Sequence, residues 1–137
     1  MLKFYKVVTT SKPQQYQLPG LFSSGARYEF CLKYTPNRWR LPAVANSKLA
    51  VFGSLKAAKD FACLRGQPQI WECEVRNPTP PACPRLVFND DLANEDMKRY
   101  WQLLKQNRES ARTLFETRSW PEDTYLVDAI KLTKKVE

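Results

Sequence analysis

The 137-residue sequence contains no histidine, and this absence removes several classes of enzyme at once. Without an imidazole the chain can form neither a Ser-His or Cys-His nucleophile pair nor an HExxH zinc site. Glycine is also scarce, with single residues at positions 20, 25, 53 and 66. Glycines spaced so widely do not form the phosphate-binding loop of a nucleotide-binding domain.

Paired cysteines and long apolar runs are missing as well. The cysteines are never spaced as CxxC, so we expect no zinc site and predict reduced, mostly buried thiols at Cys31, Cys63, Cys73 and Cys83. No apolar run approaches the roughly 18 residues of a membrane-spanning helix. The N-terminal stretch MLKFYKVVTTSKP has no hydrophobic signal core. We therefore expect a cytoplasmic protein with no membrane partner, no metal and no cofactor.

Positive charge is abundant, and it is unevenly distributed along the chain. Residues 1–68 carry 11 Lys and Arg against only Glu29 and Asp60, whereas residues 69–137 carry 11 Lys and Arg against 12 acids. The two halves thus have net charges of +9 and −1. Such an imbalance predicts a one-sided electrostatic field if the halves do not mix in space, and general solubility is the other interpretation.

The hydrophobic pattern predicts an α+β fold of one domain, residues 1–137, in which two or three helices pack on a mainly antiparallel sheet. We expect a helix over 55–65 capped by Ser54, and a second helical pattern over 94–116 that thins near 106–110. Residues 11–26 are expected to form a loop, and the proline-rich residues 77–84 a spacer or a cover for a sheet edge. Strands are expected at 4–10, 27–35, 48–53, 69–76 and 124–133.

Part of this pattern resembles a known group of sequences. The segments YKVV, NRWRLP, LAVFGSLKAAKDFA and IWECEVRNP follow one another between residues 5 and 77. They resemble small uncharacterised proteins of bacteria, phages and viruses that carry a VF-S-x-x-x-A-x-x-F element followed by an aromatic and acidic strand. The resemblance implies a compact domain of phage or viral type and brings no activity with it.

The cations of the first half are candidates for recognition of a polyanion, because cationic side chains displace the counterions of phosphates. Only two acids interrupt them, and Lys56 and Lys59 share the polar face of the predicted helix. We predict a binding module for nucleic acid or for an acidic protein surface. The predicted polyanion patch consists of Arg38, Arg40, Lys48, Lys56, Lys59 and Arg65, and a secondary patch of Lys105, Arg108 and Arg112.

The segment YTPNRWRLP places Trp39 between two of these arginines. Pro36 and Asn37 suit the centre of a turn from Thr35 to Arg38. If the chain then runs extended, Arg38 and Arg40 point to one side and Trp39 to the other. We predict that Trp39 anchors the segment in the core, that its loss costs about 3–5 kcal/mol, and that the arginines face solvent.

An enzyme is the alternative hypothesis. Glu72 and Glu74 lie two residues apart on one strand face, a spacing of roughly 7 Å that suits acid–base chemistry. Together with Arg27 and Tyr28 they can be cast in the roles of an ADP-ribosyltransferase. A solvated or ion-paired strand face that continues to Arg76 explains the same two glutamates without any chemistry.

Overall fold

The computed structural model describes residues 3–12, 15–23, 32–44, 47–63, 68–81, 85–86, 94–106, 117–118 and 120–137. Its helices are α1 (Leu55–Ala62) and α2 (Asn94–Gln106). Its strands are β1 (Phe4–Lys12), β2 (Gln15–Ser23), β3 (Lys33–Tyr34), β4 (Trp39–Arg40), β5 (Leu49–Phe52), β6 (Pro68–Arg76), β7 (Arg85–Leu86), β8 (Thr117–Arg118), β9 (Thr124–Val127) and β10 (Ala129–Lys135).

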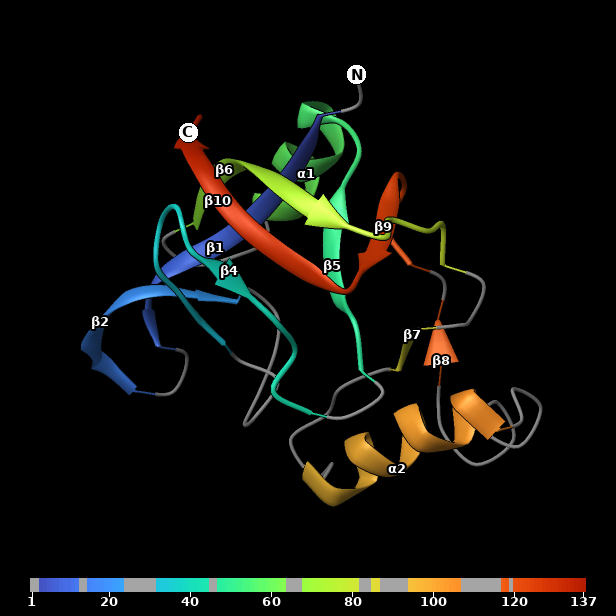
Figure 1. Cartoon of the computed structure of the whole chain (residues 1–137). Coiled ribbons are helices and arrows are strands. Elements are labelled where there is room, and N and C mark those ends of the chain that lie inside the picture. Colours follow the sequence, from blue (N-terminus) through green and yellow to red (C-terminus); the bar gives the residue numbers. More distant parts are fainter. Residues whose placement is uncertain are drawn as a thin grey trace.

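Eight of the strands form one sheet, and every pairing among the described residues is antiparallel. The main path runs β3-β2-β1-β6-β10-β4, and β5 pairs with both β1 and β9 (Figure 1). Only Asp128 separates β9 from β10. The pairing therefore makes a circuit from β1 through β6 and β10 to the bend at Asp128, and back through β9 and β5. A sheet with this connectivity curls on itself and has an inner and an outer face.

Strand alternation divides the apolar residues between these two faces. On β1, Val8 belongs to the inner cluster and its neighbour Val7 to the outer one, and Val51 and Phe52 divide in the same way on β5. The inner cluster is completed mainly by Phe4, Leu32, Tyr34, Leu49, Cys73, Val127, Ile130 and Leu132. The outer cluster joins Val7, Phe52 and Ile70 to Ala58 and Ala62 of α1.

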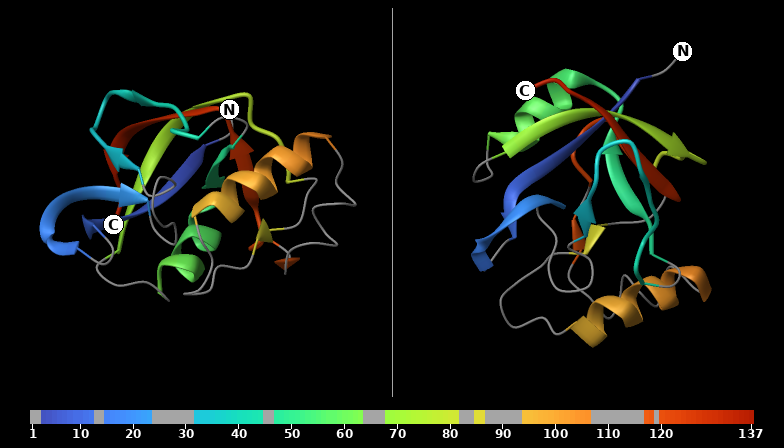
Figure 2. Two further views of the ribbon diagram at one scale, coloured as in Figure 1. Left: turned by 90° about the horizontal axis from the view of Figure 1, so that it is seen from below. Right: turned by 60° about the vertical axis from the view of Figure 1, so that its left-hand side comes forward.

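The helix α1 starts where the sequence predicts it. The Ser54 hydroxyl accepts a hydrogen bond from the Ala57 backbone N–H at 3.2 Å and donates one to Asp123 at 2.9 Å. The small side chains of Ala58 and Ala62 are buried against the sheet. Among the described residues, α1 packs on one part of the outer face, and Glu74 and Arg76 on another part of that face are exposed. Figure 2 shows α1 against the sheet and α2 at the opposite end of the molecule.

Several expectations are confirmed. The mainly antiparallel α+β arrangement with two helices is present, as are the strands expected at 4–10, 48–53 and 69–76. The proline-rich segment does cover a sheet edge, because the backbone of Thr79 exchanges two hydrogen bonds of 3.0 and 2.9 Å with Leu126 of β9. Of the strand expected at 27–35 the structure describes only 32–35, with Leu32 and Tyr34 buried and Lys33 exposed.

The loop expected over 11–26 is wrong, because β2 occupies Gln15–Ser23 and pairs with β1. Two features let a strand tolerate the proline and glycine there. Pro19 lies outside the short stretch of β2 that pairs with β3, and it pairs with Ser11 of β1 where the register is irregular; prolines in sheets are confined to such bulges and edges. Gly20 has φ of 147°, which other residues rarely adopt.

Three other boundaries differ from expectation. The segment 124–133 is two strands rather than one, because the chain bends at Asp128. The helix α1 ends at Ala62 instead of 65. The second helix begins at Asn94 as expected and is described as far as Gln106, where the apolar stripe thins. Residues 107–116 of the expected helix lie outside the described residues.

Candidate binding surface around Trp39

The segment YTPNRWRLP forms a turn followed by the edge strand β4. The turn is closed by the Arg38 N–H, which donates to the Thr35 carbonyl at 3.2 Å, and Asn37 has the positive φ of 64°. The Asn37 N–H donates to the Leu132 carbonyl at 2.7 Å and so fixes the turn to β10. The predicted turn is therefore confirmed.

The predicted orientation of Trp39 is wrong. Residues that pair across antiparallel strands share a face, and Trp39 pairs with Lys131, which itself pairs with Glu74 of β6. Glu74 alternates with buried Cys73, so Trp39 lies on the outer face. It is half-buried and belongs to neither apolar cluster among the described residues.

The opposite error applies to Arg40. It pairs with Ile130, a fully buried residue of the inner cluster, so Arg40 faces the inner side of the sheet. Its Nε is buried and has no hydrogen-bond partner within the described part of the chain. Of the two arginines that were expected to face solvent, only Arg38 is exposed. Trp39 and Arg40 lie on opposite faces as predicted, and the assignment of their faces is reversed.

Two cations from other strands lie over the indole of Trp39. The guanidinium carbon of Arg76 is 4.4 Å from the ring centroid and the ammonium of Lys131 is 5.3 Å from it. Because β10 separates β4 from β6, the ring must extend across β10 to reach Arg76. Ala129, which pairs with Arg76 on β10, has a side chain small enough to allow this, and it is only 1% exposed.

The surroundings of Trp39 carry an excess of positive charge. Arg38 and Lys134 are exposed and have no carboxylate partner among the described residues, whereas Lys131 forms an ion pair of 3.0 Å with Glu74. Leu41 follows on the same side of the chain as Trp39 and is 59% exposed. We refer to these residues together as the Trp39 surface: Arg38, Trp39, Leu41, Glu74, Arg76, Lys131 and Lys134.

The other members of the predicted polyanion patch do not gather beside Trp39. Lys48 precedes β5 and α1 follows it, so Lys48 lies at the opposite end of that strand from Lys56 and Lys59. Lys59 forms an ion pair with Glu137 at 2.8 Å, whereas Lys56 is exposed on α1 and no carboxylate partner is present in the described ranges. Arg65 lies outside the described residues.

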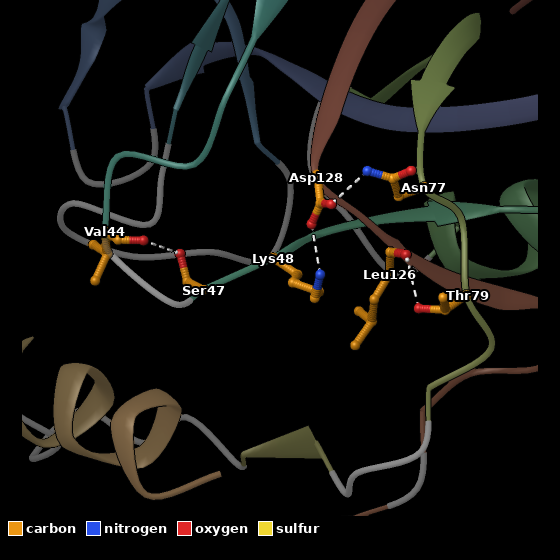
Figure 3. Close-up of polar contacts among 7 residues, drawn as sticks. All are labelled: Val44, Ser47, Lys48, Asn77, Thr79, Leu126 and Asp128. Atoms are coloured by element: carbon orange, nitrogen blue, oxygen red, sulfur yellow. Dashed lines mark hydrogen bonds and ion pairs between the residues drawn. The ribbon is translucent and has the colours of Figure 1, made fainter. Parts of the chain in front are cut away.

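The ammonium of Lys48 is engaged at the bend between β9 and β10 (Figure 3). It donates to Asp128, whose other carboxylate oxygen accepts a hydrogen bond of 2.9 Å from the Asn77 side chain. The hydrogen bond from Lys48, together with that from Asn77, holds the pKa of Asp128 below its usual value. Lys48 therefore has a structural partner at a point where the sheet must bend.

In the secondary patch only Lys105 is described. It is exposed in the last turn of α2, where a cation suits the negative end of the helix dipole. Arg108 and Arg112 lie outside the described residues.

The glutamates of the enzyme hypothesis are both engaged by lysines. Lys3 is 3.4 Å from Glu72 and Lys131 is 3.0 Å from Glu74, measured between ammonium nitrogen and carboxylate oxygen. This geometry agrees with an ion-paired strand face. Arg27 and Tyr28, the partners that the hypothesis needs, lie outside the described residues.

The described cysteines are free thiols with contrasting surroundings. Cys63 is exposed at the end of α1, whereas Cys73 is buried in the inner cluster, where desolvation raises the pKa of its thiol to about 12. Within the described ranges no group of three His, Cys, Asp or Glu side chains is arranged to hold a metal ion. None of the helices described is long and apolar enough to cross a membrane.

The residues that sequence reasoning missed are Arg76 and Lys131, both from the second half of the chain. That half is nearly neutral overall, and the cations predicted from it as a patch are those of the helical pattern, Lys105, Arg108 and Arg112. The available signal was the alternation of Glu72, Glu74 and Arg76 on one face of a strand, which marks a polar sheet face. Neither a protein-family model nor any curated protein or solved structure matches this chain.

Proposed function

We propose that this protein is a non-enzymatic binding module that recognises a polyanion, either nucleic acid or an acidic protein surface, and that the Trp39 surface makes the contact. One observation carries the proposal. On the part of the outer sheet face that α1 does not cover, the indole of Trp39 lies beneath two cations, Arg76 and Lys131. Aromatic rings interleaved with cations on an open sheet face are typical of surfaces that bind phosphate-containing polymers.

The charges around the ring support the same function. Arg76 and Lys131 lie over the ring, and Lys134 lies further along the same face of β10. Arg38 is exposed and precedes Trp39 in the chain, while Glu74 is the one acid that we include in the surface. Each cation that contacts an anionic group releases a counterion, so affinity must fall as the salt concentration rises.

Fluorescence anisotropy over a series of salt concentrations tests the proposal. The probes are a labelled 12-nucleotide strand of mixed sequence and a labelled peptide of 12 glutamates. We expect at least one of them to bind, and we expect the double variant Arg38→Glu/Lys134→Glu to weaken that binding at least tenfold. Each lost phosphate contact should also reduce the slope of log K against log salt by about 0.7 for a single strand.

The single variant Lys56→Glu is the control for position, and it changes the net charge by the same amount as Lys134→Glu alone. It makes a charge reversal at another exposed lysine, but on α1 and away from Trp39. We expect it to change affinity less than twofold. A loss of affinity in Lys56→Glu equal to that of the double variant would place the site at the dispersed cations of the first half instead. Absence of binding to both probes would refute the proposed function.

A further inference from the structure

Resting on the proposed function, we infer that the ligand of the Trp39 surface is single-stranded nucleic acid and that one of its bases stacks on the indole of Trp39. Three features of the surface lead to it: the availability of the ring, the arrangement of charge around it, and the shape of the element that carries it.

The ring is available because it lies outside both apolar clusters. Trp39 is half-buried on an edge strand, and the guanidinium of Arg76 at 4.4 Å and the ammonium of Lys131 at 5.3 Å lie over it. A guanidinium is planar and stacks on aromatic rings and on bases alike. A base that enters beside Arg76 therefore meets two stacking partners at once. Leu41, 59% exposed on the same side, provides apolar area for a neighbouring base.

The charge arrangement fits a nucleotide better than an acidic side chain. The centre of the surface is the planar indole with the cations of Arg76 and Lys131 over it, and Lys134 lies further along β10. A nucleotide has the matching distribution, a neutral planar base with a negative phosphate beside it. A cluster of carboxylates does not, because it would place negative charge next to Glu74, whose side chain is 59% exposed.

The site lies on a sheet face, which favours the binding of single strands over the binding of duplexes. In a duplex the faces of the bases are stacked on one another and unavailable to a ring, whereas an unpaired base can be turned outward onto an aromatic side chain. Sequence-specific duplex readers usually place a helix in the major groove. Here α1 covers a different part of the outer face, and α2 lies at the opposite end of the molecule from α1 (Figure 2).

The test compares Trp39→Ala and Trp39→Phe in the full chain, with a 12-nucleotide strand of mixed sequence and its duplex as probes. We expect the native protein to bind the strand at least tenfold more tightly than the duplex. Trp39→Ala should lose about tenfold in affinity for the strand, since stacking on one aromatic residue typically contributes that much or more. Trp39→Phe should retain most of the affinity, and neither variant should change the salt slope.

Tryptophan fluorescence supplies a direct readout of stacking. We expect the oligonucleotide to quench the fluorescence of the native protein and of Trp101→Phe, a matched control on α2, and to leave that of Trp39→Phe largely unquenched. Circular dichroism and urea unfolding establish that Trp39→Ala is folded. If Trp39→Ala does not fold, the loss of quenching in Trp39→Phe decides whether a base stacks on Trp39.

Three results would overturn the inference, and each differs from failure of the proposed function. Equal binding of strand and duplex, or unchanged affinity in folded Trp39→Ala, refutes base stacking. So does tighter binding of the glutamate peptide than of the strand. In these cases a polyanion still binds in a manner sensitive to Arg38→Glu/Lys134→Glu, and the proposed function stands. If no polyanion binds, both fall.

Discussion

The outer face of the sheet has two parts with opposite chemistry, although the same strand contributes to both. At its start β6 places Ile70 under α1, where Val7, Phe52, Ala58 and Ala62 complete an apolar cluster. Further along, the same face of β6 carries Glu72, Glu74 and Arg76. The covered part therefore stabilises the fold by burial, and the open part around Trp39 offers charge and an aromatic ring to solvent. The change occurs within two residues, between Ile70 and Glu72.

The largest effect expected from this contrast is on stability. Ile70→Ala removes buried methyl groups beneath α1 and should lower the free energy of unfolding by about 2–5 kcal/mol. Trp39→Ala removes a larger side chain, but a half-buried one whose contacts are partly with cations, so we expect a loss of only about 1–2 kcal/mol. Urea unfolding followed by circular dichroism measures both values. A larger loss in Trp39→Ala than in Ile70→Ala would show that Trp39 is an anchor of the core.

A smaller effect is expected at the start of α1. Ser54→Ala removes the N-cap hydrogen bond to Ala57, which should lower stability by about 1 kcal/mol. Because α1 covers the apolar part of the face, affinity for a polyanion should not change. Ser47→Ala, which removes a hydroxyl that donates to the Val44 carbonyl at 2.7 Å, is the control for loss of a serine elsewhere. Reduced affinity in Ser54→Ala at full folding would mean that the two parts of the face are coupled.

The pH dependence of stability tests how much the Asp128 carboxylate stabilises the bend between β9 and β10. Lys48 and Asn77 lower the folded-state pKa of Asp128 below its unfolded value of about 3.9. The stabilisation is therefore present above that pH and is lost as the pH falls through the folded-state pKa. Asp128→Asn should reduce stability at neutral pH and flatten its decline below about pH 4.

Urea midpoints measured from pH 7 to pH 3 test this expectation. Asp60→Asn, on the exposed side of α1, changes the net charge equally and is the reference variant. Superimposable pH profiles for Asp128→Asn and Asp60→Asn would contradict a special role for the carboxylate at the bend.

The smallest stability effect is expected on the open part itself. Lys131→Met removes an ion pair with Glu74 in which both side chains are partly exposed, so the free energy of unfolding should change by no more than about 0.5 kcal/mol. Affinity for a polyanion should nevertheless fall, because a cation beside Trp39 is lost. A matched change on α1, Lys56→Met, should alter neither quantity. A large loss of stability in Lys131→Met would show that the open part is structural.

The elements that the sequence predicts well are those whose signals are local. The helix α1 follows from Ser54 and from the spacing of Leu55, Ala58 and Ala62, and β6 follows from its alternation. The strand β2 was not predicted, because Pro19 and Gly20 usually indicate a loop. Whether a strand can contain them depends on the strands that pair with it. That information lies in the pairing with β1 and β3, not in the segment itself.

The Trp39 surface, too, could not be predicted from local sequence alone. Alternation establishes that Trp39 and Arg40 lie on opposite faces, but it does not say which face is the inner one. Pairing with Ile130 and Lys131, some 90 residues away, decides that question. The cations over the ring come from β6 and β10, so a search for charge close to Trp39 in the sequence finds Arg38 and Arg40 instead.

The circuit that closes the sheet has a consequence for the order of events during synthesis. The strand β10 provides the pairing partner of β4 and, through the bend at Asp128, the link to β9 and β5. A ribosome therefore releases residues 39 and 76 long before residue 131 exists to separate and align their strands. Until β10 is in place, Trp39 has no strand to extend across and no fixed distance to Arg76. The ability to bind a ligand at this ring should thus arise last, as a late product of folding that a nascent chain does not yet possess.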